Sequence, residues 1–269
     1  QPFYSALLDG CIEHGKDCRD YKYFADTIVQ PVGQVTCVNS LAAIKKLVFD
    51  DKKVTMAELV EALKNNWEGK EELRQMFLRA PEFGNDDPYV DEIARDFTLR
   101  NAQVVHSFKN IWGYEYAEDG TGGASYYGWS GLTGATPDGR KDRDLFSDGT
   151  VSPAIGSDKK GPTGVLKSVG AIDHTHTLTH LFNQRFLPQF LEGDNREAFV
   201  SYLRSFIDLG IHHVQFNIVD NETLLDARKH PEKHGDLVVR VAGYSAYFID
   251  LKEEIQDQIM ERTQQTLNR

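Results

Sequence analysis

Residues 238–246 read VVRVAGYSA, an apolar, strand-like run that one glycine interrupts and that YFI at residues 247–249 resumes. An isolated glycine inside a strand usually marks a bulge or a close approach of the backbone. A tight turn at Gly243, with Arg240 on the surface, is therefore the structural alternative to any chemical role. The remainder of the chain has to decide between these two interpretations.

Length and composition are those of an ordinary globular protein. The chain has 269 residues, of which 40% are hydrophobic and 26% charged, which suffices for one large domain or two smaller ones. The formal net charge of −11 argues against a nucleic-acid-binding protein, which normally presents a basic face. We expect no transmembrane segment, because the longest apolar runs, such as 237–243, are too short to cross a bilayer.

The cysteines and the first residues predict the compartment. Cys11, Cys18 and Cys37 form no Cys-x-x-Cys pair, so neither a zinc ribbon nor a cysteine-ligated iron–sulfur cluster is expected. The N-terminus lacks the basic segment and long apolar core of a signal peptide. We therefore expect reduced thiols and a cytoplasmic location.

Helices dominate the predicted first half. Apolar periodicity and capping residues predict a helix at 2–14, one capped by Ser40, one opened by a capping box of Thr55 and Glu58, one at 71–78, and a long one that begins at Asp87 and Pro88. Residues 113–164 are rich in glycine and polar residues. Such long irregular stretches are usually functional or disordered, and the interleaved aromatic residues favour an ordered set of turns here.

The second half alternates between helices and strands. The predicted elements are a strand or short helix at 163–172, a helix at 195–209, a strand at 212–219, a helix at 223–229, a strand at 237–241 and a closing helix at 251–263. Alternation of this kind is typical of an α/β architecture with parallel strands.

The segment RVAGYSA, followed by a polar amphipathic helix, resembles the signature of the glycyl radical enzymes, in which the α-carbon of the glycine stores an unpaired electron. The similarity covers nearly the whole chain in the family's order. It is carried by GKD at 15–17, SLAAI at 40–44, GNDD at 84–87, ATPDGR at 135–140, DGTVSP at 148–153, GPT at 161–163, HVQFN at 213–217, LLDA at 224–227 and HPE at 230–232. The chain is most similar to the dehydratases and lyases of the pyruvate formate-lyase-like branch.

The resemblance implies a fold and a division of the chain. It implies the C-terminal half of a β/α barrel, with parallel strands inside, helices outside and a glycine-radical loop inserted into the barrel. Residues 1–140 would be the C-terminal part of the pyruvate formate-lyase-like barrel domain. Residues 141–269 would be the glycine radical domain.

Gly243 is the one catalytic residue that the resemblance implies. Loss of a hydrogen atom from its α-carbon gives a planar radical shared with the adjacent amide nitrogen and carbonyl, and a side chain would twist that system. The site must also be shielded, because oxygen attacks a carbon radical and cuts the chain. We expect bulk from Val241, Tyr244, Tyr247 and Phe248 to exclude water, and Arg240 to hold the loop through charge-assisted hydrogen bonds. The full set of expected loop supports is Arg240, Val241, Ala242, Tyr244, Ser245 and Phe248.

The resemblance also implies partners. In the family an upstream half of the barrel carries a cysteine that becomes a thiyl radical, and this chain corresponds to the part downstream of that half. Cys11 matches a different family segment, so a partner chain is expected to supply the thiyl cysteine. Either the gene is split and a second polypeptide carries the cysteine half, or this chain is a fragment. Half a barrel would expose strand edges and apolar surface, which also requires a partner. An activating enzyme that uses S-adenosylmethionine and an iron–sulfur cluster would install the radical.

The activity implied is anaerobic elimination of water or an amine from a small polar substrate by an organic radical. Assembly into a higher oligomer is also compatible with the resemblance. Decarboxylation or carbon–carbon cleavage are alternatives within the family. Two further alternatives are a spare radical domain that repairs an oxygen-cleaved enzyme and a structural paralogue whose glycine carries no radical.

Other candidate sites are weaker. His174, His176 and His180 have spacing that zinc ligands can show, but no carboxylate is evidently placed with them, so we expect ordinary polar or core histidines. The glycines of 119–123 and 131–139 lack the lysine and hydroxyl residue of a phosphate-binding loop. Neither a bound metal nor a bound nucleotide is therefore expected.

Overall fold

The computed structural model describes residues 1–20, 27–111, 113–120, 125–193, 195–241, 243–262 and 264–265. Its α-helices are α1 (Pro2–Leu7), α2 (Cys11–His14), α3 (Gln34–Ile44), α4 (Met56–Lys64), α5 (Glu71–Leu78), α6 (Pro88–His106), α7 (Ser125–Ser130), α8 (Gly161–Gly170), α9 (Asn195–Asp208), α10 (Asn221–Lys229) and α11 (Glu253–Glu261). A π-helical turn at Lys45–Asp50 continues α3. None of the helices described has both the length and the apolar character that crossing a membrane requires.

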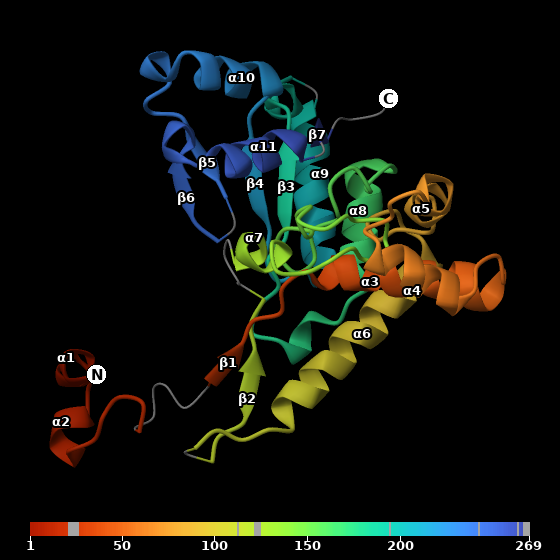
Figure 1. The fold of residues 1–269 in the computed structure, drawn as a ribbon. Coiled ribbons are helices and arrows are strands. Elements are labelled where there is room, and N and C mark those ends of the chain that lie inside the picture. The colour runs from red at the N-terminus through yellow and green to blue at the C-terminus, as the bar shows by residue number, and fades with distance from the viewer. Residues whose placement is uncertain are drawn as a thin grey trace.

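The strands of the described chain form short sheets (Figure 1). They are β1 (Thr27–Val29) paired in parallel with β2 (Tyr116–Glu118), β3 (Asn183–Phe186) paired in parallel with both β4 (Gln215–Ile218) and β7 (Gln264–Gln265), and β5 (Val238–Arg240) paired antiparallel with β6 (Ser245–Tyr247). Helix α9 connects β3 to β4, as the crossover between parallel strands requires. The predicted α/β architecture with parallel strands is confirmed.

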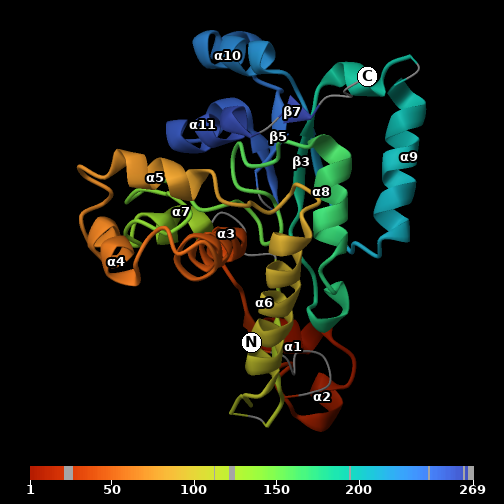
Figure 2. The same cartoon turned by 90° about the vertical axis from the view of Figure 1, so that its right-hand side faces the viewer.

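The N-terminal helices and the C-terminal elements lie at opposite ends of the molecule. In Figures 1 and 2, α10, α11 and the β5–β6 hairpin gather at one end, and α1 and α2 lie at the opposite end. The parallel strands β3 and β4 lie between, with α8 and α9 beside them in Figure 2.

Two hydrophobic clusters hold these layers together. The larger one joins α3, α6, α8, α9 and the β3–β4 pair, and it contains residues from both sides of residue 140, such as Val38 and Phe186. A second cluster packs α10 and α11 against β5 through residues such as Leu224 and Ile259. The predicted division at residue 140 therefore separates segments of sequence that share one core.

One predicted helix start is wrong, and one predicted helix is divided in two. Ser40 caps no helix, because α3 begins at Gln34 after Gly33, whose φ is +70°, and Ser40 lies buried within it. A side chain on Gly33 would meet the Phe146 ring at 2.9 Å, so close packing selects glycine there. The helix predicted at 2–14 is divided by Gly10, whose φ of +84° separates α1 from α2.

Local capping chemistry is confirmed elsewhere. The Glu58 N–H donates to Thr55 Oγ1 at 3.2 Å, and the Thr55 N–H donates to Glu58 Oε2 at 2.8 Å, which completes the predicted capping box. Asp87 accepts the Tyr89 N–H at 3.0 Å and caps α6. The segment 163–172 was predicted as a strand or a short helix, and its residues up to Gly170 lie in α8. The strand predicted at 237–241 is β5, but it forms a hairpin instead of joining the parallel sheet.

Candidate active site

Gly243 lies at the tip of the β5–β6 hairpin. The register pairs Arg240 with Ser245, and the Val241 N–H donates to the Tyr244 carbonyl at 2.9 Å, so pairing continues up to the tip. The φ of Gly243 is +76°, in the left-handed region where glycine has no steric penalty. A short hairpin turn of this kind favours glycine on conformational grounds alone. The turn thus satisfies the structural interpretation of Gly243 without excluding the chemical one.

Strand β4 binds the hairpin through two side-chain amides. Asn217 Oδ1 accepts the Arg240 N–H at 2.7 Å, and Asn217 Nδ2 donates to the Arg240 carbonyl at 2.7 Å. One side chain therefore makes both hydrogen bonds that a neighbouring strand would make. Gln215 Oε1 accepts the N–H of Gly243 at 3.3 Å. Gln215 and Asn217 are buried and share one face of β4.

The sequence predicted this alternation but assigned Gln215 and Asn217 no role. The strand prediction placed them opposite Val214, Phe216 and Ile218. Two long amides on one face of a short strand were the available signal, because buried amides require hydrogen-bond partners. The identity of that partner was not readable, since Arg240 lies 23 residues away from Asn217.

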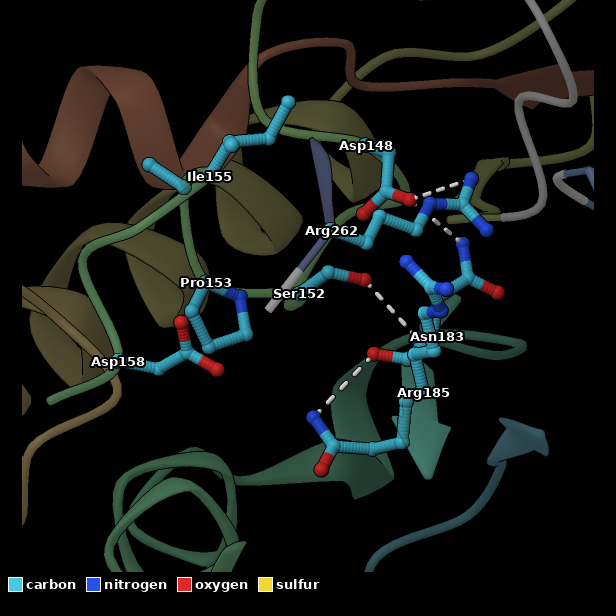
Figure 3. A pocket seen from close by; sticks show the side chains of 10 residues that line it. Asp148, Ser152, Pro153, Ile155, Asp158, Asn183, Arg185 and Arg262 are labelled. Carbon is cyan, nitrogen blue, oxygen red and sulfur yellow. Dashed lines mark hydrogen bonds and ion pairs between the residues drawn. The ribbon is translucent and has the colours of Figure 1, made fainter. Parts of the chain in front are cut away.

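A buried arginine completes the attachment. Arg262 follows α11 and donates from Nη1 to the Arg240 carbonyl at 3.1 Å and from Nη2 to the Val241 carbonyl at 2.6 Å. Its Nη2 also lies 2.6 Å from Asp148 Oδ2. Figure 3 shows this pair beside Asn183, whose side-chain amide donates to Asp148 Oδ2 at 3.2 Å.

The expected loop supports differ in their surroundings. Val241 and Phe248 are fully buried, whereas Tyr244 is 41% and Tyr247 49% exposed. Gly243 and Ser245 are exposed, and Ala242 lies outside the described residues. The Arg240 guanidinium donates across the hairpin to Ser245 Oγ at 3.0 Å. The charge-assisted bonds to carbonyls that we expected from Arg240 come instead from Arg262, which is the more deeply buried of the two.

The cavity nearest to this arrangement is small. It has a volume of about 30 Å³, which is enough for about one water molecule. Residues that line it include Asp148, Ser152, Asn183, Arg185 and Arg262 (Figure 3). A substrate would not fit there, so this cavity is not a substrate-binding site. The residues that line it serve to attach the hairpin.

Two of the three candidate histidines, His174 and His180, are buried and in contact. His174 lies in a short 3₁₀ turn, its Nε2 is 3.0 Å from the Val169 carbonyl, and its Nδ1 is 3.0 Å from His180 Nδ1. His176 is exposed on the same turn. Within the described ranges no group of three or more histidine, cysteine or acidic side chains is placed to hold a metal ion.

Burial controls the titration of this cluster. Burial, followed by the neighbouring His174 and His212, lowers the pKa of His180 to about 3. Burial also lowers the pKa of His174. Because His174 Nε2 donates to a carbonyl, its Nδ1 accepts from His180 Nδ1, and protonating His180 would create a buried N–H with no acceptor.

We predict a pH-dependent loss of stability from His180. Its pKa is lower in the folded state, so its contribution is present above about pH 6.5 and is lost as the pH falls towards its folded value. Between pH 6.5 and 5 the free energy of unfolding should fall by about 1 kcal/mol per pH unit relative to His180→Asn. Urea denaturation at several pH values measures this difference. His176→Asn changes a histidine of the same turn whose pair with Asp173 is exposed, so it is the control and should change the slope far less than His180→Asn does.

Comparisons with known proteins show which family this chain resembles. Residues 1–125 match the family described as Pyruvate formate lyase-like, and residues 147–249 match the one described as Glycine radical. The chain is 40% identical over 98% of its length to the isethionate sulfite-lyase of Nitratidesulfovibrio vulgaris, and 38% identical over 98% to the trans-4-hydroxy-L-proline dehydratase of Clostridioides difficile. The glycerol-bound B12-independent glycerol dehydratase from Clostridium butyricum superposes with a TM-score of 0.91 at 40% identity over 99% of this chain.

These findings define the class of protein. The chain belongs to the glycyl radical enzyme family, and its fold is the corresponding part of the fold of those enzymes. It spans 32% and 34% of the two curated relatives and 34% of the glycerol dehydratase chain. The expected resemblance to the pyruvate formate-lyase-like lyases and dehydratases is confirmed.

Proposed function

We propose that Gly243 is the radical-storing residue of an anaerobic lyase that eliminates water or an amine from a small polar substrate. The observation that carries this proposal is the attachment of the hairpin tip. The N–H of Gly243 is held by Gln215, and the two carbonyls of Arg240 and Val241 that precede the tip are held by Asn217 and Arg262. A turn that only reverses the chain does not need buried polar groups from β4 and from the residue after α11 to fix it.

Holding the backbone on either side of the tip keeps the Gly243 α-carbon in one place. A glycyl radical is stabilised when its α-carbon is coplanar with both neighbouring amides, and at a φ of +76° Gly243 is not coplanar with them, so the peptide at the tip must flatten when the radical forms. In the proposed sequence an activating enzyme that uses S-adenosylmethionine would remove a hydrogen atom from the Gly243 α-carbon, and the 5′-deoxyadenosyl radical released by one-electron reductive cleavage of S-adenosylmethionine would accept that atom. The glycyl radical would then take a hydrogen atom from a cysteine thiol, and the resulting thiyl radical would take one from the substrate. After the elimination the product radical would take a hydrogen atom back from the thiol, and the thiyl radical would recover one from the Gly243 α-carbon.

Gly243 is exposed in this chain, although a carbon radical must be protected from oxygen. Protection must therefore come from outside the described residues. Large apolar side chains such as Ile111 and Leu132 are also mostly exposed, which agrees with a covering partner. Since the relatives are about three times as long, we propose that the cysteine-bearing barrel half covers Gly243, as a partner chain or as the remainder of a longer protein.

Cys11 is an unsuitable source of the thiyl radical. It is buried in α2, and burial, with contributions from Cys18 and Asp17, raises the pKa of its thiol. Helix α2 and the β5–β6 hairpin lie at opposite ends in Figures 1 and 2. The alternative of a spare radical domain is also less well supported, because the chain matches the barrel family over residues 1–125 as well. Decarboxylation stays a second candidate, since an indoleacetate decarboxylase from Tractidigestivibacter scatoligenes is 34% identical.

We predict that Gly243→Ala abolishes the radical. After anaerobic activation together with the cysteine-bearing half, wild type should show an electron paramagnetic resonance doublet from the glycyl α-hydrogen, and Gly243→Ala should show none. Gly235→Ala is the matched control, because nothing lies within 4 Å of a Cβ added there, and it should retain the doublet. A doublet of undiminished intensity in Gly243→Ala would contradict the assignment.

We predict that Cys11→Ser leaves both the radical and turnover within about twofold of wild type, because the thiol is packed in α2 away from the hairpin. The measurement is the spin count per chain and the rate of product formation in the complete enzyme. Loss of turnover with an intact doublet would instead identify Cys11 as the thiyl residue.

A further inference from the structure

The two carbonyls directly before the hairpin tip converge on one side chain. The Arg240 carbonyl accepts from Arg262 Nη1 at 3.1 Å, and the Val241 carbonyl accepts from Arg262 Nη2 at 2.6 Å. The two nitrogens of one planar guanidinium thus hold consecutive carbonyls in fixed relative positions. Because Val241 precedes the tip by two residues, any shift of Arg262 is transmitted to Gly243 through a very short length of backbone.

Asp148 fixes Arg262 from the side of the barrel strands. Its Oδ2 lies 2.6 Å from Arg262 Nη2, and both side chains are buried, at 7% and 8% exposed. The segment that carries Asp148 is attached to β3, because the Asn183 N–H donates to Ser152 Oγ at 2.9 Å and the Asn183 side chain donates to Asp148 at 3.2 Å. Asp148 therefore lies between Asn183 of β3 and Arg262 and contacts both, as the dashed lines of Figure 3 mark.

A second arginine fixes the backbone from which Arg262 extends. Arg185 of β3 is fully buried and donates from Nη1 to the carbonyls of Ile259 at 3.2 Å and Met260 at 3.0 Å. The last carbonyls of a helix have no partner within the helix, so these bonds tie the end of α11 to β3. Arg262 comes directly after this end and is thereby held at its backbone and at its guanidinium.

We propose that Arg262 is a positioning residue for the glycyl radical, with Asp148 as its buried counter-charge. The pair sets the position of the Gly243 α-carbon relative to β3 and β4. The radical role of Gly243 is taken from the proposed function, whereas the positioning of the hairpin is an independent structural claim. Asn217 also binds the backbone of Arg240, whereas Arg262 joins the hairpin to Asp148, which lies more than a hundred residues earlier in the sequence.

The chemistry of arginine makes a specific substitution informative. Lysine keeps the positive charge but has a single nitrogen, so it cannot present two donors in the fixed fork that reaches both carbonyls and the carboxylate. Asp148→Asn keeps the shape of the carboxylate and removes its charge, which leaves Arg262 buried without its counter-ion. The two substitutions thus remove the geometry and the charge balance separately.

An ion pair of α11, the helix that Arg262 follows, provides a matched control. Arg228 Nη1 lies 2.7 Å from Asp257 Oδ1, in an ion pair that joins α10 to α11 at the surface. Asp257→Asn removes this pair from α11 and leaves the end of the helix intact. Exposed pairs contribute little, so this substitution should change neither the hairpin nor the radical.

The test combines amide hydrogen exchange with electron paramagnetic resonance on the complete protein. In Arg262→Lys and Asp148→Asn, exchange of the hairpin peptide 237–248 should become at least tenfold faster, while α9 exchanges as in wild type. After activation, the Gly243 doublet should decay at least tenfold faster when a small-molecule thiol is added. Asp257→Asn should match wild type in both measurements.

The two measurements separate the positioning role from the proposed function. Unchanged exchange in the hairpin of both variants would overturn the positioning role, whatever the radical does. A uniform rise in exchange across the whole chain would also overturn it, because the pair would then stabilise the protein generally. Local exchange that rises in the variants, when activated wild type itself lacks any doublet, would retain the positioning role and remove the proposed radical function.

Discussion

The hairpin that carries Gly243 has only two strands, and this leaves the backbone groups at its outer edge without a strand partner. Buried backbone N–H and carbonyl groups need hydrogen bonds, since leaving one unpaired costs roughly 1–3 kcal/mol. Here the partners are side chains. Asn217 pairs with both polar groups of Arg240, Gln215 accepts from Gly243, and Arg262 donates to two carbonyls. The hairpin is held in position because its edge is completed by other elements.

This constraint explains why the surrounding architecture takes its form. Strand β4 must present two amides on one face, and its neighbour β3 must hold Asp148 and the end of α11 at the correct distance. The parallel pairing of β3 with β4, which sets Asn183 opposite Gln215, does both. The aromatic cluster on the other side of these strands, including Phe186 and Phe216, keeps the pair rigid against α9. Packing on one face of the strands thus supports polar attachment on the other.

The sequence predicted elements best where a signal is local. The capping box at Thr55 and the cap at Asp87 depend on residues three positions apart or fewer, and both are present in the structure. Ser40 was assigned as a cap by the same reasoning, but the packing of Gly33 against Phe146 decides where that helix begins. A contact over more than a hundred residues cannot be recognised from periodicity. The glycine at the tip was found because an entire string of residues around it is distinctive.

The residues that hold the tip were missed for a related reason. Asp148, Gln215, Asn217 and Arg262 come from three separate segments, and each is of a type that is usually solvated at the surface. Arg240 was expected to tie down the loop because it is adjacent in sequence, whereas Arg262 does so because it is adjacent in space. The shared face of Gln215 and Asn217 in the predicted strand was the available signal for these two residues, and nothing local marked Asp148 or Arg262.

Cleavage by air tests most directly whether the unpaired electron resides at Gly243. The complete protein is activated without oxygen, exposed to air and analysed by intact mass spectrometry. The account predicts that the chain is cut at Gly243 and releases a C-terminal fragment that begins at or next to Tyr244, with no cut in protein that was never activated. An activated chain that stays whole in air, or one that is cut at another residue, would contradict it.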